Sequence, residues 1–313
     1  MELLKRTGAE RTARRALQAL ALLAAFACAA SAVPWGAARG STSYKHLVLP
    51  STARSAALAG GGVSWTGNGL GPVQPASSPR GPLRLSFDRA WMPEEVGARL
   101  DRIALERGVG RNGFSLAATI LDYDDIDGYT DDDAPAGSYG AGAWHVSFGW
   151  SRALGAAEWG MRLSGGRYAI EDESSWAATG DFGLAVALPF GLRAGTALRN
   201  VGWATKFLRD EPSLPTELVA GLSHHGRLES GFLSWSAGCD ARRRNGDGLA
   251  AVVSGELVFR DRFALRAGWP FGEDEPGISA GVGFLGTWVD IDYALVTDGL
   301  YGMRHHLGLA ILL

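Results

Sequence analysis

From about Pro82 to the end of the chain, bulky apolar residues alternate with small or polar ones at every second position. Successive side chains of a β-strand point to opposite faces, so a period of two predicts strands and not helices. The alternation is clearest in three runs, which begin at Trp144, Phe182 and Phe263. We therefore predict an all-β fold.

The composition of the two strand faces indicates where each face points. A soluble β-sandwich would carry Lys, Glu and Thr on its second face, whereas here that face is mostly Gly, Ala and Ser. Small residues suit a crowded lumen and bulky ones suit contact with lipid. We count about fourteen candidate strands from Leu83 onward, and predict a transmembrane antiparallel β-barrel of that size. An exported soluble β-protein is the alternative.

Connection lengths support the barrel, because bacterial barrels alternate short periplasmic turns with longer extracellular loops. The short connections are expected at 154–156, 188–191, 260–262 and 285–287. The longer, polar ones are expected at 122–140, 170–175, 204–214, 240–248 and 271–276. An even strand number would place both ends of the barrel in the periplasm.

The N-terminus has the pattern of an export signal. Basic residues between Lys5 and Arg15 precede an apolar run over 16–30 and the sequence Ala30-Ser31-Ala32. This predicts a signal peptide of residues 1–32, cleaved at an A-x-A site, with lipoprotein processing at Cys28 as a rival. No later segment is long and apolar enough for a transmembrane helix. We divide the rest into an N-terminal plug-like or hatch-like segment, 33–80, and a barrel, 81–313, in the bacterial outer membrane.

Composition narrows the functional classes further. The chain has 44 glycines and 11 tryptophans, and its formal net charge of −3 does not favour nucleic acid as a partner. After removal of Cys28, Cys239 would be the one remaining thiol, which excludes an internal disulfide and a Cys-rich metal site. We expect no cofactor.

Motifs for catalysis are missing from the sequence. It contains no G-x-S-x-G elbow, H-E-x-x-H pair or phosphate loop, so we expect no catalytic residue and no enzyme activity, with an outer-membrane hydrolase as a remote alternative. An acidic stretch does not fit the spacing of an EF-hand, and we interpret it as a solvated extracellular loop in preference to a calcium site. Its residues are Asp124, Asp125, Asp127, Asp131, Asp132 and Asp133.

A second charged set is predicted on the lumen face. An arginine that faces lipid near the midplane would cost about 2–4 kcal/mol, so the alternation should turn these groups inward. We favour ion pairing across the lumen over ligand contacts as their role. The set is Arg162, Arg193, Arg199, Glu256, Arg266, Asp290 and Asp292.

Five short stretches together form a recognisable pattern: 53–61 (ARSAALAGG), 130–133 with the strand at 144–154, 198–202 (LRNVG) with Leu214-Pro215, 255–257 with 264–269, and 292–294 with 305–309. The pattern resembles the PorV/PorQ family of outer-membrane proteins, whose barrels are similar to those of the FadL long-chain fatty-acid transporters. One departure is that Gln74-Pro75-Ala76 is the nearest match to an Asn-Pro-Ala element that the family usually has, which leaves ligand gating by this region open.

The resemblance implies a function. PorV-like proteins hold or hand over cargo in type IX secretion, so the chain would be a component of, or accessory to, such surface export. Its loops at 122–140 and 204–214 would contact secretion-machinery proteins or exported cargo, and its barrel would contact outer-membrane lipid. The alternative is a FadL-like transporter of small hydrophobic molecules, which requires an apolar pocket lined by the N-terminal segment and a lateral opening in the wall. A purely structural membrane protein is a third possibility.

Overall fold

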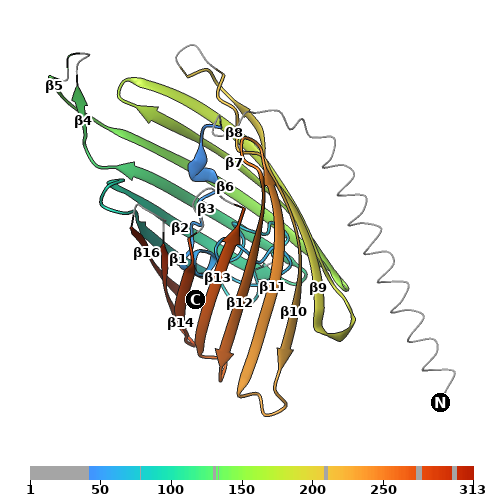
Figure 1. The fold of residues 1–313 in the computed structure, drawn as a ribbon. Helices are drawn as coiled ribbons and strands as arrows, with labels where there is room; N and C mark the ends of the chain where they lie inside the picture. Colours follow the sequence, from blue (N-terminus) through green and yellow to red (C-terminus); the bar gives the residue numbers. More distant parts are fainter. Residues whose placement is uncertain are drawn as a thin grey trace, which may run out of the picture.

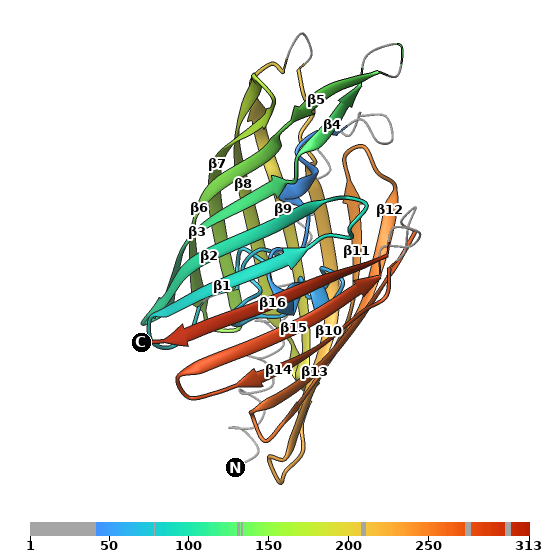
Figure 2. The ribbon, with the colours of Figure 1, turned by 90° about the vertical axis from the view of Figure 1, so that its left-hand side faces the viewer.

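The structure is a computed structural model that describes residues 42–77, 79–129, 132, 134–207, 211–272, 277–297 and 302–313. In this part of the chain, fourteen antiparallel strands form a closed barrel (Figures 1 and 2), which confirms the predicted fold class. The predicted signal peptide, residues 1–32, lies outside the described residues. No described helix is long and apolar enough to cross a membrane.

Each barrel strand pairs with its sequence neighbours, and β1 pairs with β16 to close the cylinder, with Phe87 opposite Leu309. Two further strands, β4 (Ile126–Tyr129) and β5 (Pro135–Tyr139), form a separate hairpin beyond one end of the barrel (Figure 2). The barrel strands are β1 Arg84–Trp91, β2 Ala98–Val109, β3 Asn112–Tyr123, β6 Ala141–Leu154, β7 Ala157–Ile170, β8 Glu173–Ala187, β9 Leu192–Ala204, β10 Glu217–Arg227, β11 Leu233–Arg244, β12 Leu249–Phe259, β13 Phe263–Phe271, β14 Ser279–Leu285, β15 Val289–Thr297 and β16 Met303–Leu312.

The bulky faces of the strands point out of the barrel. Phe148 is 52% exposed and Leu265 is 49% exposed, whereas their strand neighbours Gly149 and Ala264 are buried. The same alternation continues around the cylinder and gives it an apolar outer belt, as on barrels that cross a bilayer. Cys239 lies on this outer surface and is exposed.

The connections differ between the two ends of the barrel. The end without the hairpin has short turns, including Gly155-Ala156 and the 3₁₀ turn η2 (Pro189–Gly191). We call it the short-turn end, and the other one the hairpin end. Two predicted long loops, 170–175 and 240–248, are wrong in their bounds: β7 ends at Ile170 and β8 begins at Glu173, and β11 continues to Arg244 before β12 begins at Leu249. The other polar residues of these stretches continue the strands, and only short turns connect them.

The N-terminal part of the described chain lies inside the barrel. We call residues 42–83, apart from Ser78, the lumenal segment (Figure 2). It contains a 3₁₀ turn, η1 (Lys45–Leu47), and one short helix, α2 (Ala53–Ala57), which a capping box between Thr52 and Ser55 begins. Leu58, Trp65 and Leu70 form its own apolar cluster.

Glycines of the wall let this segment approach closely. A Cβ atom on Gly195 would lie 2.2 Å from the carbonyl oxygen of Val63, and one on Gly268 would lie 2.3 Å from the carbonyl carbon of Leu58. The lumenal segment therefore packs directly against the inner face of the strands, which carries small residues. Helix α2 packs against β13 to β16 and against β1, so it lies across the closure between β1 and β16.

Candidate functional site

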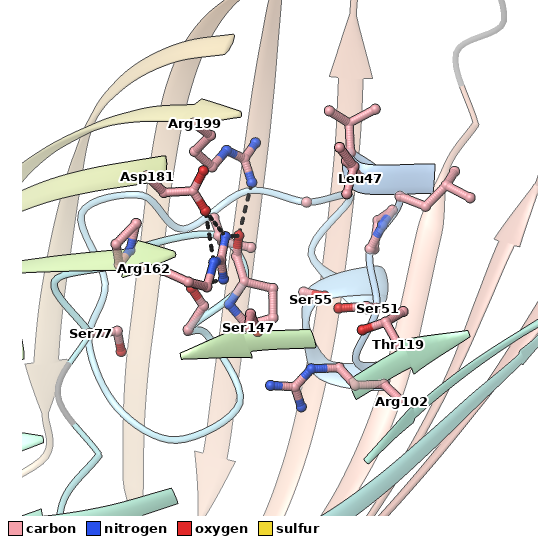
Figure 3. Close-up of a pocket in the computed structure, with 18 of the residues that line it drawn as sticks. Leu47, Ser51, Ser55, Ser77, Arg102, Thr119, Ser147, Arg162, Asp181 and Arg199 are labelled. Atoms are coloured by element: carbon pink, nitrogen blue, oxygen red, sulfur yellow. Dashed lines mark hydrogen bonds and ion pairs between the residues drawn. The ribbon is translucent and has the colours of Figure 1, made fainter. Parts of the chain in front are cut away.

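A cavity of about 230 Å³ lies between the lumenal segment and the wall (Figure 3). The segment contributes apolar residues to its lining, among them Leu47, Val48 and Pro72. The wall contributes polar residues of β2, β3 and β6, among them Thr119 and Ser147. The site therefore has one apolar side and one polar side.

Arg162 and Arg199 join the wall to the lumenal segment beside this cavity. Arg162 Nε donates to Asp181 Oδ2 over 2.7 Å, and its Nη1 donates to the carbonyl oxygen of Gly71 over 2.9 Å (Figure 3). Arg199 pairs with the fully buried Glu217 and donates from Nη1 to the carbonyl oxygen of Pro72 over 3.1 Å. These two arginines hold the Gly71-Pro72 turn.

Arg193 likewise joins the wall to the lumenal segment, at Ser64. Its Nε donates to the carbonyl oxygen of Ser64 over 3.1 Å, and its Nη2 lies 3.5 Å from Glu158 Oε1. Glu158 Oε1 also accepts from Arg80 Nη2 over 2.6 Å. One wall carboxylate thus binds an arginine of the wall and an arginine of the segment.

The remaining members of the predicted lumen set form a chain of ion pairs on the opposite wall. Glu256 accepts from Arg54 of α2 over 2.9 Å and from Arg266 Nε over 2.6 Å. Arg266 Nη1 also donates to Asp292 Oδ1 over 2.5 Å. Asp290 is paired with Arg84 Nη1 over 3.0 Å. All seven predicted residues lie on the inner face, and each has a charged partner, which is the geometry of a structural network.

The motif Arg199-Asn200 forms a bulge in the wall. Pairing of β8 with β9 shifts register next to Asp181, and Asn200 has a φ of 57°. The backbone N–H of Asn200 donates to Asp181 Oδ1 over 2.6 Å, and the side-chain Nδ2 of Asn200 donates to the carbonyl oxygen of Pro215 over 3.3 Å. Asparagine tolerates this left-handed conformation better than most residues, so the bulge is a built feature of the wall.

Several residues at the contact between segment and wall were not predicted from the sequence. Asp240 Oδ2 accepts from the amides of Gly62 and Val63, and Gln74 Nε2 donates to the carbonyl oxygen of Val63. Gln74 is fully buried, and its side-chain amide helps to hold the lumenal segment in place. The strand phase of Asp240 could have placed it inside, but nothing local indicates which amides it meets.

His46 and His145 line the cavity, and the aromatic residues Tyr44 and Tyr168 lie nearby. The Tyr44 hydroxyl donates to Ser175 Oγ over 2.6 Å, and the Tyr44 ring lies 5.8 Å from that of Tyr168. The His46 ring lies 5.7 Å from the ring of His145 on β6. Burial lowers the pKa of His46 to about 4, so this imidazole is neutral at pH 7.

The acidic stretch is only partly described. Asp124 and Asp125 precede β4, Asp127 lies within it, and Asp132 lies in the turn before β5. Asp131 and Asp133 are outside the described residues. Among the residues that are described, no group of three or more His, Cys, Asp or Glu side chains is placed to hold a metal ion.

Solved structures with a similar fold show what this arrangement resembles. The toluene transporter TbuX of Ralstonia pickettii gives a TM-score of 0.56 at 14% identity, over 83% of this chain and 96% of that one. The toluene transporter TodX of Pseudomonas putida gives 0.58 at 11% identity, again over 83% and 96%. This chain has the toluene-transporter fold. The FadL-like barrel expected from the sequence is therefore confirmed at the level of fold.

The comparisons do not support the finer assignment. No protein-family model and no curated protein matches the chain. The PorV/PorQ assignment and the secretion role that it implied find no support among these similar structures. The resembling stretches nevertheless have definite places: 53–61 forms α2 and the turn after it, and 198–202 forms the bulge in β9.

Proposed function

We propose that this protein is a bacterial outer-membrane transporter for small hydrophobic molecules. The observation that carries the proposal is the cavity between the lumenal segment and the wall, partly lined by Leu47, Val48 and Leu49. Pockets of this kind bind small ligands through apolar walls and a few polar groups. The apolar outer belt and the fold shared with two toluene transporters agree with this role.

In this proposal the hairpin end faces the cell exterior and the short-turn end faces the periplasm, because bacterial barrels have their short turns on the periplasmic side. A solute would enter at the hairpin end and reach the cavity between the lumenal segment and the wall. The segment is held by many polar contacts, so we expect the solute to pass beside it and not to expel it as a unit.

Uptake of toluene by a Gram-negative host that expresses the chain tests the proposal. We expect faster uptake than in a vector control. Ser147→Phe adds a ring on the cavity side of β6 and should reduce uptake, whereas Val146→Phe adds the same ring on the outer face, where Val146 is 44% exposed, and should not. Uptake at the vector rate by correctly inserted protein would contradict the proposal.

The secretion role gives a different result in a second experiment. A tagged chain can be pulled down from detergent-solubilised outer membrane of its own host. Recovery of secretion components without any effect on toluene uptake would favour the PorV-like function over transport.

A further inference from the structure

We infer that the cavity contains a subsite for an oxyanion, centred on Arg102, and that the transported molecules include small organic acids with an apolar body. This inference rests on the proposed transport function and specifies its substrate class. Arg102 was not among the lumen charges predicted from the sequence, and its geometry differs from theirs.

Arg102 lies on β2 with its side chain in the cavity, and the residue is 6% exposed (Figure 3). Among the described residues its guanidinium has one charged neighbour, Asp88, whose Oδ2 lies 4.0 Å from Nη1. That distance is too long for a hydrogen bond, and Asp88 already accepts from the Ala53 amide through Oδ1. A guanidinium has five N–H donors, and those of Arg102, which bond to no described residue, are available to a ligand in the cavity.

The neighbours of Arg102 on the inner wall are also hydrogen-bonding groups. Strand pairing places Thr119 of β3 opposite Arg102, and His145 of β6 opposite Thr119. His145 Nδ1 is buried and has no partner within the described chain. The hydroxyls of Thr119 and Ser147 likewise bond to no described residue, and both residues line the cavity. Side chains opposite each other on adjacent strands are close enough to bind one small group together.

The wider charge balance of the cavity favours an anion. Its lining contains six arginines and two carboxylates, Glu106 and Asp181. Asp181 is bound by Arg162, and Glu106 lies 4.0 Å from Arg84. Arg199 and Arg244 are paired with Glu217 outside the lining, and the lining itself carries more cationic than anionic groups, which favours an anion over a cation. The fork of Arg102 matches two oxygens of a carboxylate or phosphate.

The cavity has room for the rest of the ligand. Its volume of about 230 Å³ accommodates a compact molecule. The apolar residues of the lumenal segment, such as Leu47 and Val48, face the cavity from the side opposite the polar wall. The arrangement suits a small ring or short hydrocarbon that carries one acidic group.

Calorimetry on the full-length protein in detergent tests the subsite with benzoate and benzamide, which differ in charge and hardly in shape. We expect benzoate to bind at least tenfold more tightly than benzamide, because hydrogen bonds to a charged group are the stronger ones. Arg102→Gln should remove this preference, and Arg102→Lys should restore part of it. Arg99→Gln, on the same strand but facing outward, should leave it unchanged.

A second variant distinguishes the loss of a ligand contact from misfolding of the Arg102→Gln protein. Thr119→Val keeps the shape of the side chain and should weaken benzoate about threefold while benzamide binding stays the same. Inorganic phosphate, added as a competitor, distinguishes a general oxyanion site, where it displaces benzoate, from a carboxylate-selective one, where it does not. Both results support the subsite.

Equal binding of benzoate and benzamide, or an Arg102→Gln protein that binds benzoate like the wild type, would overturn the inference. The transport proposal fails separately, because it depends on toluene uptake and not on benzoate binding. A protein that takes up toluene but does not prefer benzoate retains the proposed function and loses the subsite.

Discussion

Asp181 connects three parts of the molecule through one carboxylate. Its two oxygens accept from Arg162 and from the amide of Asn200, and Arg162 in turn holds the carbonyl oxygen of Gly71 in the lumenal segment. Asp181 is 2% exposed. A buried charge with this many partners is expensive to disturb, because the partners that remain are left without compensation.

Asp181→Asn should therefore destabilise the barrel by about 3–5 kcal/mol, the usual cost of breaking a buried ion pair. Electrophoresis of samples preheated to increasing temperatures separates folded from unfolded barrel and measures this loss of stability. Asp122→Asn is the matched control, because Asp122 pairs with Arg99 where both side chains are about half exposed. It should change stability by less than about 1 kcal/mol. Equal effects of the two substitutions would show that the Asp181 contacts do not stabilise the barrel.

The burial of His46 leads to a prediction about how the stability of the protein depends on pH. Its pKa is about 4 in the folded protein and about 6.5 in an unfolded chain, so the folded state binds fewer protons between these values. Stability should fall as the pH drops from about 6.5 to about 4, by at most about 3 kcal/mol from this group. The ring that faces His46 is that of His145, 5.7 Å away, and a histidine has no negative charge to offset the new positive one.

Thermal unfolding of the wild type and of His46→Gln, each measured at pH 7 and at pH 4, isolates this effect. The wild type should lose more stability on acidification than the variant does. Identical pH dependence in the two proteins would mean that His46 is protonated without cost.

At the scale of elements, the strands were predictable because alternation is a local property of the sequence. The run from Trp144 to Trp150 lies on β6 as expected. The predicted loop at 170–175 was wrong because most of its polar residues belong to strands that continue past the apolar belt. The path of the lumenal segment was not predictable, since it depends on contacts such as Asp240 with Gly62, which are far apart in sequence.

Gly195→Ala tests the fit between wall and lumenal segment. The added methyl group would lie 2.2 Å from the carbonyl oxygen of Val63, so the segment must shift. We expect a loss of about 1–3 kcal/mol of stability, typical of overpacking, measured as a lower unfolding temperature in detergent. Gly165→Ala is the control, because its methyl group would have nothing nearer than 3.9 Å. The fit would be looser than described if Gly195→Ala were as stable as the control.

At the scale of the whole molecule, the inner and outer surfaces follow the alternation, but charged pairs such as Arg99 and Asp122 also occur on the outer side. Arg89 and Asp101 form an ion pair over 2.5 Å on the outer side, although charged groups were expected inside. The Arg89 guanidinium also lies over the rings of Phe87 and Trp91. Alternation gives the face of a residue but not its depth in the bilayer, so this pair could not be foreseen.

Labels on adjacent residues of β6 test the orientation of the wall. In a Cys239→Ser background, a spin label on Phe148→Cys should be accessible to oxygen dissolved in acyl chains, and one on Ser147→Cys should be shielded from it. Phe148 is 52% exposed on the outer surface, whereas Ser147 lines the cavity. A water-exposed label at Phe148 would contradict a membrane-spanning barrel.

Helix α2 has a consequence for how the protein is made. It touches β1 through the bond from the Ala53 amide to Asp88, and β14 through the bond from Ser279 Oγ to the carbonyl oxygen of Ala57. These bonds lie on both sides of the closure between β1 and β16. We therefore expect α2 to reach its place before or while the last strand, β16, pairs with the first, so that the barrel closes around it.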